Sequence, residues 1–145
     1  MTLNELLQDM NLSRALVDDA VRLIDRQVAN KSGLGGMAVK GGYAAVKKVG
    51  PGIIPSVLGR LLPDFSPAMQ GHYDKGLASG DVDAYFRKQA SAIANDLLKV
   101  TDARAARANN KVLKKVYGKL RKVAMKHTTD GVPELSGLLQ RHLAA

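Results

Sequence analysis

The sequence predicts an all-α fold, a single compact irregular bundle of six to eight helices over residues 1–145. Apolar residues recur at helical spacing, and no run of useful length alternates apolar and polar residues as a half-buried strand would. Aromatic residues are scarce, with two Phe, four Tyr and no Trp, so the core must consist mostly of aliphatic side chains, which suits helix-on-helix packing. The length of 145 residues fits one domain, and no repeat or linker divides it.

Two helices are expected before residue 33. Thr2 and Glu5 have the spacing of a capping box, which predicts a short opening helix. A second helix is expected from about Ser13 to Asn30, with Gly33 as its left-handed stop. Its apolar face consists of Val17, Val21, Ile24 and Val28.

Proline and glycine signals divide the middle of the chain. Pro51 or Pro55 is expected to open a short helix that stops at Pro63. Ser66 and Pro67 then begin another helix, which ends between Gly76 and Gly80.

Three helices are expected in the remainder of the chain. Asp81 is the predicted cap of a long helix over 82–103, which should pair in antiparallel fashion with a helix over 110–127. Pro133 is expected to open a short final helix.

A glycine-rich segment, residues 33–52, holds seven of the fourteen glycines. Its first residues match G-x-G-x-x-A, but a dinucleotide site needs a preceding strand and an acidic residue about 20 positions on. Here a helix is expected before the motif, and the next acid is Asp64, so this interpretation fails.

The segment is better explained as a helix over 36–49 with small residues along one side. These residues would let another helix approach closely, and Gly50 to Gly52 would form the corner of a buried helical hairpin. The alternative is contact with a membrane, because the chain has no acidic residue from Gly33 to Pro63. The packing or interface residues predicted are Ala38, Gly42, Ala45 and Val49.

The clearest functional signal is a basic amphipathic helix at 110–127. The chain carries a net charge of +9, and residues 109–145 contribute eight basic and two acidic groups, or +6. No acid lies between Arg104 and Asp130, so the cations have no partner on their own helix. The predicted anion-binding residues are Lys111, Lys114, Lys115, Lys119, Arg121, Lys122 and Lys126.

These cations predict a non-enzymatic protein that contacts the backbone of a nucleic acid or an anionic membrane surface without sequence specificity. No aromatic residues are interleaved for base stacking, and no helix-turn-helix spacing is present. The alternative without a binding function is a solvated lysine-rich face whose charge is balanced by acidic residues of the second helix. A further alternative is a protein–protein module or homo-oligomer that uses the small residues of 36–49.

No constellation indicates catalysis, a metal or a cofactor, so neither an enzyme nor a cofactor is expected. His72, Tyr73 and Asp74 are adjacent, but no third metal ligand lies nearby, so a histidine at a turn or helix end is expected; the alternative is an enzyme or small-ligand site around these three residues. His127 is expected to be a satisfied group at the edge of an apolar face, and His142 to be exposed. No cysteine is present.

No membrane-spanning segment is predicted, because the longest uncharged stretch, from Val49 to Gly59, has eleven residues against the about 20 required. The N-terminus carries acids instead of the basic start of a signal peptide, so a cytoplasmic location is expected.

The run SGLGGMAVKGGYAAVKKVGPGIIPSVLGRLLPDF, with the later MQGHYDKG, resembles a family of small uncharacterised bacterial proteins of unknown function. The resemblance extends over essentially the whole chain. It implies an all-helical single domain, and it supplies no activity, cofactor or catalytic residue.

Overall fold

The computed structural model describes residues 1–50 and 52–144, and in these ranges the chain forms seven helices and no strand. The predicted all-α bundle is therefore confirmed. The helices are α1 (Leu3–Gln8), α2 (Met10–Ala29), α3 (Gly33–Val49), α4 (Ile53–Ser79), α5 (Val82–Lys88), α6 (Ala90–Arg107) and α7 (Lys111–Leu143).

The local capping signals near the N-terminus predict the first helices well. The Thr2 hydroxyl accepts from the Glu5 N–H, and the Glu5 carboxylate accepts from the Thr2 N–H, so the capping box is confirmed. α2 begins earlier than predicted because the Asp9 carboxylate accepts from the Leu12 N–H and starts the helix at Met10. Gly33 has the left-handed φ of 72°, but it is the first residue of α3.

The helix boundaries predicted at prolines, a stop at Pro63 and starts at Pro67 and Pro133, were wrong in two helices. α4 passes through Pro63 and Pro67 without interruption, and α7 passes through Pro133, so the separate helices predicted at those prolines do not exist. Each proline removes one backbone donor. The apolar side chains of Leu62, Met69 and Tyr73 are buried along α4, and this packing favours a continuous helix. The expected role of Pro51 lies outside the described residues.

The helix predicted over 82–103 is instead two helices. Asp81 caps α5 as predicted, by accepting from the Ala84 N–H, but α5 ends at Lys88 and α6 begins at Ala90. α6 packs along α7, as expected of the predicted antiparallel pair.

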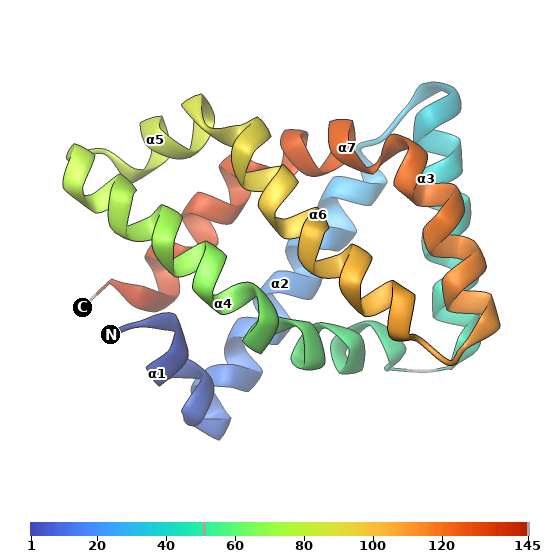
Figure 1. The fold of residues 1–145 in the computed structure, drawn as a ribbon, viewed down its shortest axis with the longest axis horizontal. Helices are drawn as coiled ribbons and strands as arrows, with labels where there is room; N and C mark the ends of the chain where they lie inside the picture. Colours follow the sequence, from blue (N-terminus) through green and yellow to red (C-terminus); the bar gives the residue numbers. More distant parts are fainter. Residues whose placement is uncertain (51, 145) are drawn as a thin grey trace.

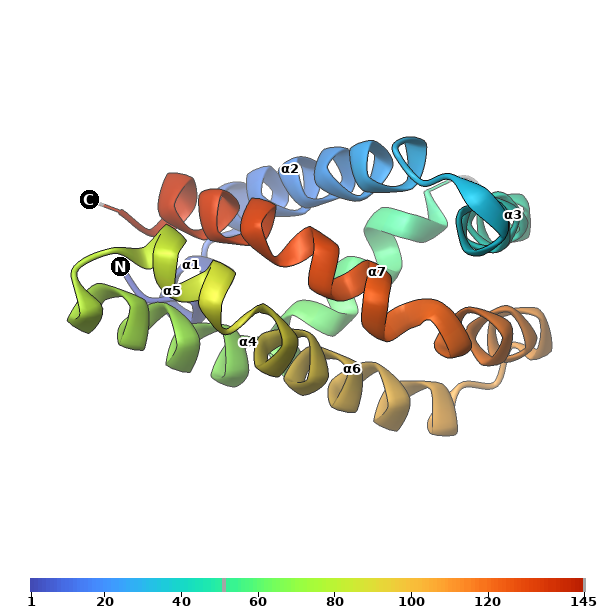
Figure 2. The ribbon, with the colours of Figure 1, turned by 90° about the horizontal axis from the view of Figure 1, so that it is seen from above.

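α7 passes between α2 on one side and α5 and α6 on the other, as Figures 1 and 2 show. Its two halves run in different directions, the first along α3 and the second along α2 (Figure 1). The main hydrophobic core includes Leu3, Leu16, Phe86, Ile93 and Leu139. No residue of α3 belongs to this core, and α3 with the beginning of α7 forms one end of the molecule (Figure 2).

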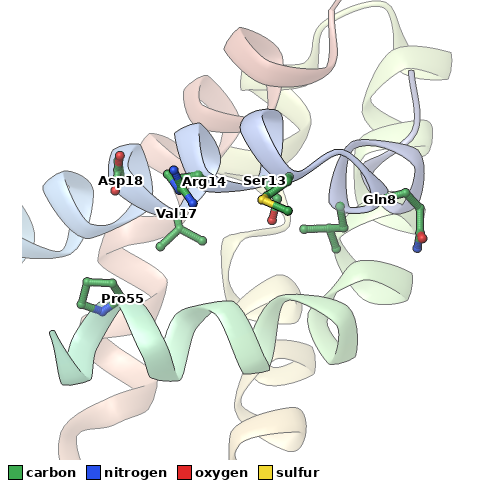
Figure 3. A pocket seen from close by; sticks show the side chains of 8 residues that line it. Gln8, Ser13, Arg14, Val17, Asp18 and Pro55 are labelled. Carbon is green, nitrogen blue, oxygen red and sulfur yellow. The ribbon is translucent and has the colours of Figure 1, made fainter.

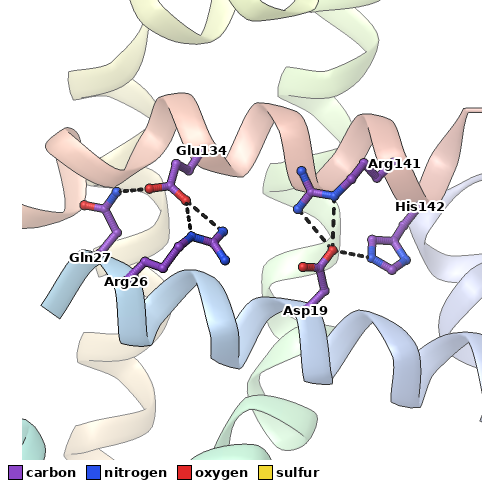
Figure 4. Close-up of polar contacts among 6 residues, drawn as sticks. All are labelled: Asp19, Arg26, Gln27, Glu134, Arg141 and His142. Atoms are coloured by element: carbon purple, nitrogen blue, oxygen red, sulfur yellow. Dashed lines mark hydrogen bonds and ion pairs between the residues drawn. The ribbon is translucent and has the colours of Figure 1, made fainter. Parts of the chain in front are cut away.

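The second half of α7 is joined to α2 by two polar clusters (Figure 4). Asp19 accepts from Arg141 at 3.0 Å and lies 2.9 Å from Nε2 of His142. Burial opposes ionisation of Asp19, but the hydrogen bonds from His142 and Arg141 lower its pKa overall. His142 is half-buried, so the expected exposure of this side chain was wrong. In the other cluster, Glu134 accepts from Arg26 and Gln27.

Candidate functional site

The first half of α7 carries the predicted cations on its outer side. The Asn110 side chain accepts from the N–H groups of Val112 and Leu113, at 2.9 Å and 3.1 Å, and so fixes where α7 begins. Val116 is buried, and Leu120 and Val123 are half-buried against the rest of the molecule. Six exposed lysines form what we call the lysine face: Lys111, Lys114, Lys115, Lys119, Lys122 and Lys126.

In residues 1–50 and 52–144, none of the six ammonium groups of the lysine face makes an ion pair or a side-chain hydrogen bond, although Asp130 follows Lys126 by four residues on α7. Five of the six, all but Lys114, fall within an arc of about 80° when the helix is drawn at about 100° per residue. The acids nearest in sequence are engaged elsewhere, since Asp102 accepts from Arg121 and Asp130 lies 3.8 Å from Lys31.

Arg121 differs from the predicted lysines. Its Nε donates to Asp102 of α6 at 2.9 Å, and the Tyr117 hydroxyl donates to the same carboxylate. Hydrogen bonds from Tyr117 and Arg121 lower the pKa of Asp102, and the bond to Asp102 raises the pKa of Arg121. Arg121 therefore joins α7 to α6 and stands apart from the lysine face.

The acidic residues of α2 form no ion pairs with the lysine face in the described residues. Asp19 is bound to Arg141 and His142 in the second half of α7. Asp25 accepts from Tyr43 and lies 3.5 Å from Lys47. Asp18 is exposed, and in the described part of the chain it makes no ion pair with α7. The plain alternative to a binding face, that α2 neutralises the lysines, therefore has no support in these contacts.

The glycine-rich helix α3 packs along the first half of α7 in the opposite direction. A Cβ added at Gly42 would lie 2.9 Å from three atoms of Leu120, and one added at Gly35 would lie 3.4 Å from Nε2 of His127. Of the four residues predicted for packing or an interface, Gly42, Ala45 and Val49 are half-buried, and Ala38 is exposed.

The expected burial of α3 was wrong. Gly36 is the one buried residue of this helix, and Leu34 and Met37 are 88% and 69% exposed. Sequence reasoning missed these two side chains, although a helical wheel places them away from Gly35 and Gly42.

His72, Tyr73 and Asp74 do not form a common site. His72 lies inside α4, not at a turn, and its Nε2 and Nδ1 contact Asp96 at 2.8 Å and Tyr85 at 3.2 Å. Tyr73 is in the hydrophobic core, and Asp74 is exposed and accepts from Gln70. The expectation of a helix-end histidine was therefore wrong, and the trio points in three directions.

His127 lies between α7 and α3. Its Nδ1 is buried and has no hydrogen-bond partner in the described residues, so the expectation of a satisfied histidine was wrong for this atom. Burial lowers the pKa of His127, and the positive charge of Lys31 lowers it further.

An open groove lies between the α1–α2 corner and the start of α4 (Figure 3). Among the described residues that line it, Arg14 and Asp18 are charged, and the others are Leu7, Gln8, Met10, Ser13, Val17 and Pro55. The described residues contain no group of three or more His, Asp or Glu side chains arranged to hold a metal ion. No helix among them has the length and apolar character needed to cross a bilayer.

Comparison with known families gives a match over nearly the whole chain. A model described as a family of unknown function, DUF6918, matches residues 3–143. The chain belongs to this family. The resemblance noted from the sequence is thus confirmed as to family and helical fold. No curated protein and no solved structure matches the chain.

Proposed function

We propose that this member of the family is a non-enzymatic binding protein that uses the lysine face of α7 to contact a surface of phosphate groups. The observation that supports the proposal best is the set of six exposed lysines that make no ion pair in the described residues. A helix stabilised only for its own fold would gain from glutamates at i,i+4 spacing, because like charges at this spacing are destabilising.

The ligand chemistry follows from the side chains. A lysine ammonium is a flexible point charge that suits phosphate oxygens without a fixed geometry. Release of condensed counterions then supplies much of the binding free energy and makes binding sensitive to salt. The phosphates of a nucleic acid backbone and those of anionic lipids share this chemistry.

The absence of a catalytic role is part of the same proposal. His72 is held by Asp96 and Tyr85, and the groove between α2 and α4 has one exposed cation and one exposed carboxylate. Neither arrangement brings together a nucleophile, a base and a group that orients the base.

The test is charge reversal at three positions of the lysine face: Lys115→Glu, Lys119→Glu and Lys122→Glu in one variant. Binding of the full chain to double-stranded DNA, RNA and phosphatidylglycerol-containing vesicles would be compared with the parent. Three lysines near a phosphate surface contribute about 1 kcal/mol each, so the ligand that the parent binds should be bound about 100-fold more weakly.

A matched control separates the location of charge from its amount. Lys75→Glu, Lys88→Glu and Lys99→Glu replace three other exposed lysines, on α4, α5 and α6. Both triple variants change the net charge from +9 to +3, because each substitution removes two charges. Equal loss of binding in the two variants, or no loss in either, would overturn the proposal.

A further inference from the structure

One exposed side of α3 is largely apolar, and Lys40 and Lys47 are exposed beside it. Leu34 is 88% exposed and Met37 is 69% exposed. Isolated exposed apolar side chains are ordinary on protein surfaces. These two side chains instead lie on the same side of one helix. When α3 is drawn at about 100° per residue, this side covers an arc of about 120°, and its one charged residue is Lys48. The exposed residues of this apolar face are Leu34, Met37, Ala38, Gly41, Ala44 and Lys48.

The apolar face of α3 and the lysine face of α7 point outward on the same side of the molecule. On α3, Gly35 and Gly42 face α7, and the flank that carries Tyr43 and Lys47 contacts α2. The opposite flank carries Leu34 and Ala38.

α7 has the corresponding arrangement. Its residues Leu120 and Val123 face α3, and the flank that carries Tyr117 and Arg121 contacts α6. The opposite flank carries the lysine face, including Lys119. Because α2 and α6 both extend from the same side of the α3–α7 pair (Figure 2), both free flanks face outward together. Val112, which is 50% exposed, lies on this outer side as well.

We propose that the combined face is a docking surface for an anionic lipid bilayer, with Leu34 and Met37 entering the headgroup boundary and the lysines contacting lipid phosphates. This inference rests on the proposed function and specifies its partner. Charge complementarity carries it, since neither α3 nor α7 up to Thr129 contains an acidic residue.

The apolar side chains favour a membrane over a nucleic acid. A bilayer removes exposed Leu and Met side chains from water while its headgroups meet the surrounding lysines, which is the arrangement of interfacial amphipathic helices. A nucleic acid backbone would engage the lysines and leave Leu34 and Met37 in water.

The test removes the apolar side chains and keeps every lysine. The double variant Leu34→Ser, Met37→Ser should bind vesicles of phosphatidylcholine and phosphatidylglycerol about tenfold more weakly than the parent, because burial of such side chains is lost. A matched control, Met10→Ser with Leu77→Ser, changes one Met and one Leu that are 75% and 55% exposed elsewhere. The control should bind these vesicles as the parent does.

Fluorescence gives a second readout, because the chain contains no Trp. In a Leu34→Trp variant, the anionic vesicles should shift tryptophan emission to shorter wavelength and make it quenchable by brominated acyl chains. In a Leu77→Trp variant they should leave the emission unchanged.

The outcomes separate this inference from the function on which it rests. Vesicle binding that depends on Lys115, Lys119 and Lys122 but not on Leu34 and Met37 would overturn the inference and leave the proposed function intact. Binding of the parent to DNA or RNA but not to the vesicles would do the same. A parent dimer that becomes monomeric in the Leu34→Ser, Met37→Ser variant, with unchanged vesicle binding, would identify the face as a contact between copies and also overturn the inference.

Discussion

Gly41 and Gly42 offer a direct test of how α3 is seated on α7. Both lie inside α3, and neither has a positive φ. A Cβ at Gly41 meets nothing within 4 Å, whereas a Cβ at Gly42 would lie 2.9 Å from Cγ, Cδ1 and Cδ2 of Leu120. The two adjacent residues therefore differ in contact with α7 and share their helical conformation.

The expected changes in the free energy of unfolding follow from two effects. Alanine is favoured over glycine inside a helix by about 1 kcal/mol, and this gain applies to both Gly41→Ala and Gly42→Ala. Overpacking costs about 1–3 kcal/mol, and it applies only at Gly42, because Leu120 or the backbone of α3 must move. Gly41→Ala should thus stabilise the protein by about 1 kcal/mol, and Gly42→Ala should be less stable than Gly41→Ala by about 1–3 kcal/mol.

Urea denaturation of both variants, followed by far-ultraviolet circular dichroism, measures the difference in the free energy of unfolding. Since the amino-acid change is identical, the difference reports the contact with Leu120. Equal stabilisation by the two substitutions would refute the close approach of α3 to α7 at Gly42.

Two further predictions concern pH and local stability. Because the folded state lowers the pKa of His127 below 6.5, the unfolded state binds a proton first, so the free energy of unfolding should fall as the pH drops below about 6.5. In urea denaturation at neutral and mildly acidic pH, the free energy of unfolding should fall less with pH in the His127→Gln variant than in the parent. The same pH dependence in both proteins would contradict a lowered pKa of His127 in the folded state. Amide hydrogen exchange should be faster in α3 than in α4 around Tyr73, because no residue of α3 belongs to the main core. Equal protection of the two helices would show that α3 opens only with the whole molecule.

The helix starts could be predicted from sequence where the signal is local. Thr2 with Glu5, and Asp81, cap the helices they were expected to cap, because a capping side chain acts within three residues of itself. The helix boundaries predicted at prolines failed because burial against distant parts of the chain decides whether a helix continues. Ser136, close to Pro133, is completely buried and donates to Asp83 on α5, a contact that no local pattern reveals.

The candidate site could be predicted in the same partial way. A helical wheel alone collects the lysines of α7 on one side. It cannot find Asp102, nineteen residues before Arg121 on another helix, so the different role of Arg121 emerges only in three dimensions. The exposure of Leu34 and Met37 was missed for a related reason. Small residues on α3 predict close packing on one side, but they do not say how many sides are covered.

Salt dependence tests the central claim, that the lysine face binds phosphate groups, most directly. For double-stranded DNA the slope of log K against log salt concentration is about −0.9 per phosphate contact, so reversal of Lys115, Lys119 and Lys122 should make the slope less steep by about 2.7. Anionic vesicles should show a change in the same direction. The control variant with reversals at Lys75, Lys88 and Lys99 should keep the parent slope. A parent slope near zero, or the same slope in both triple variants, would contradict the account.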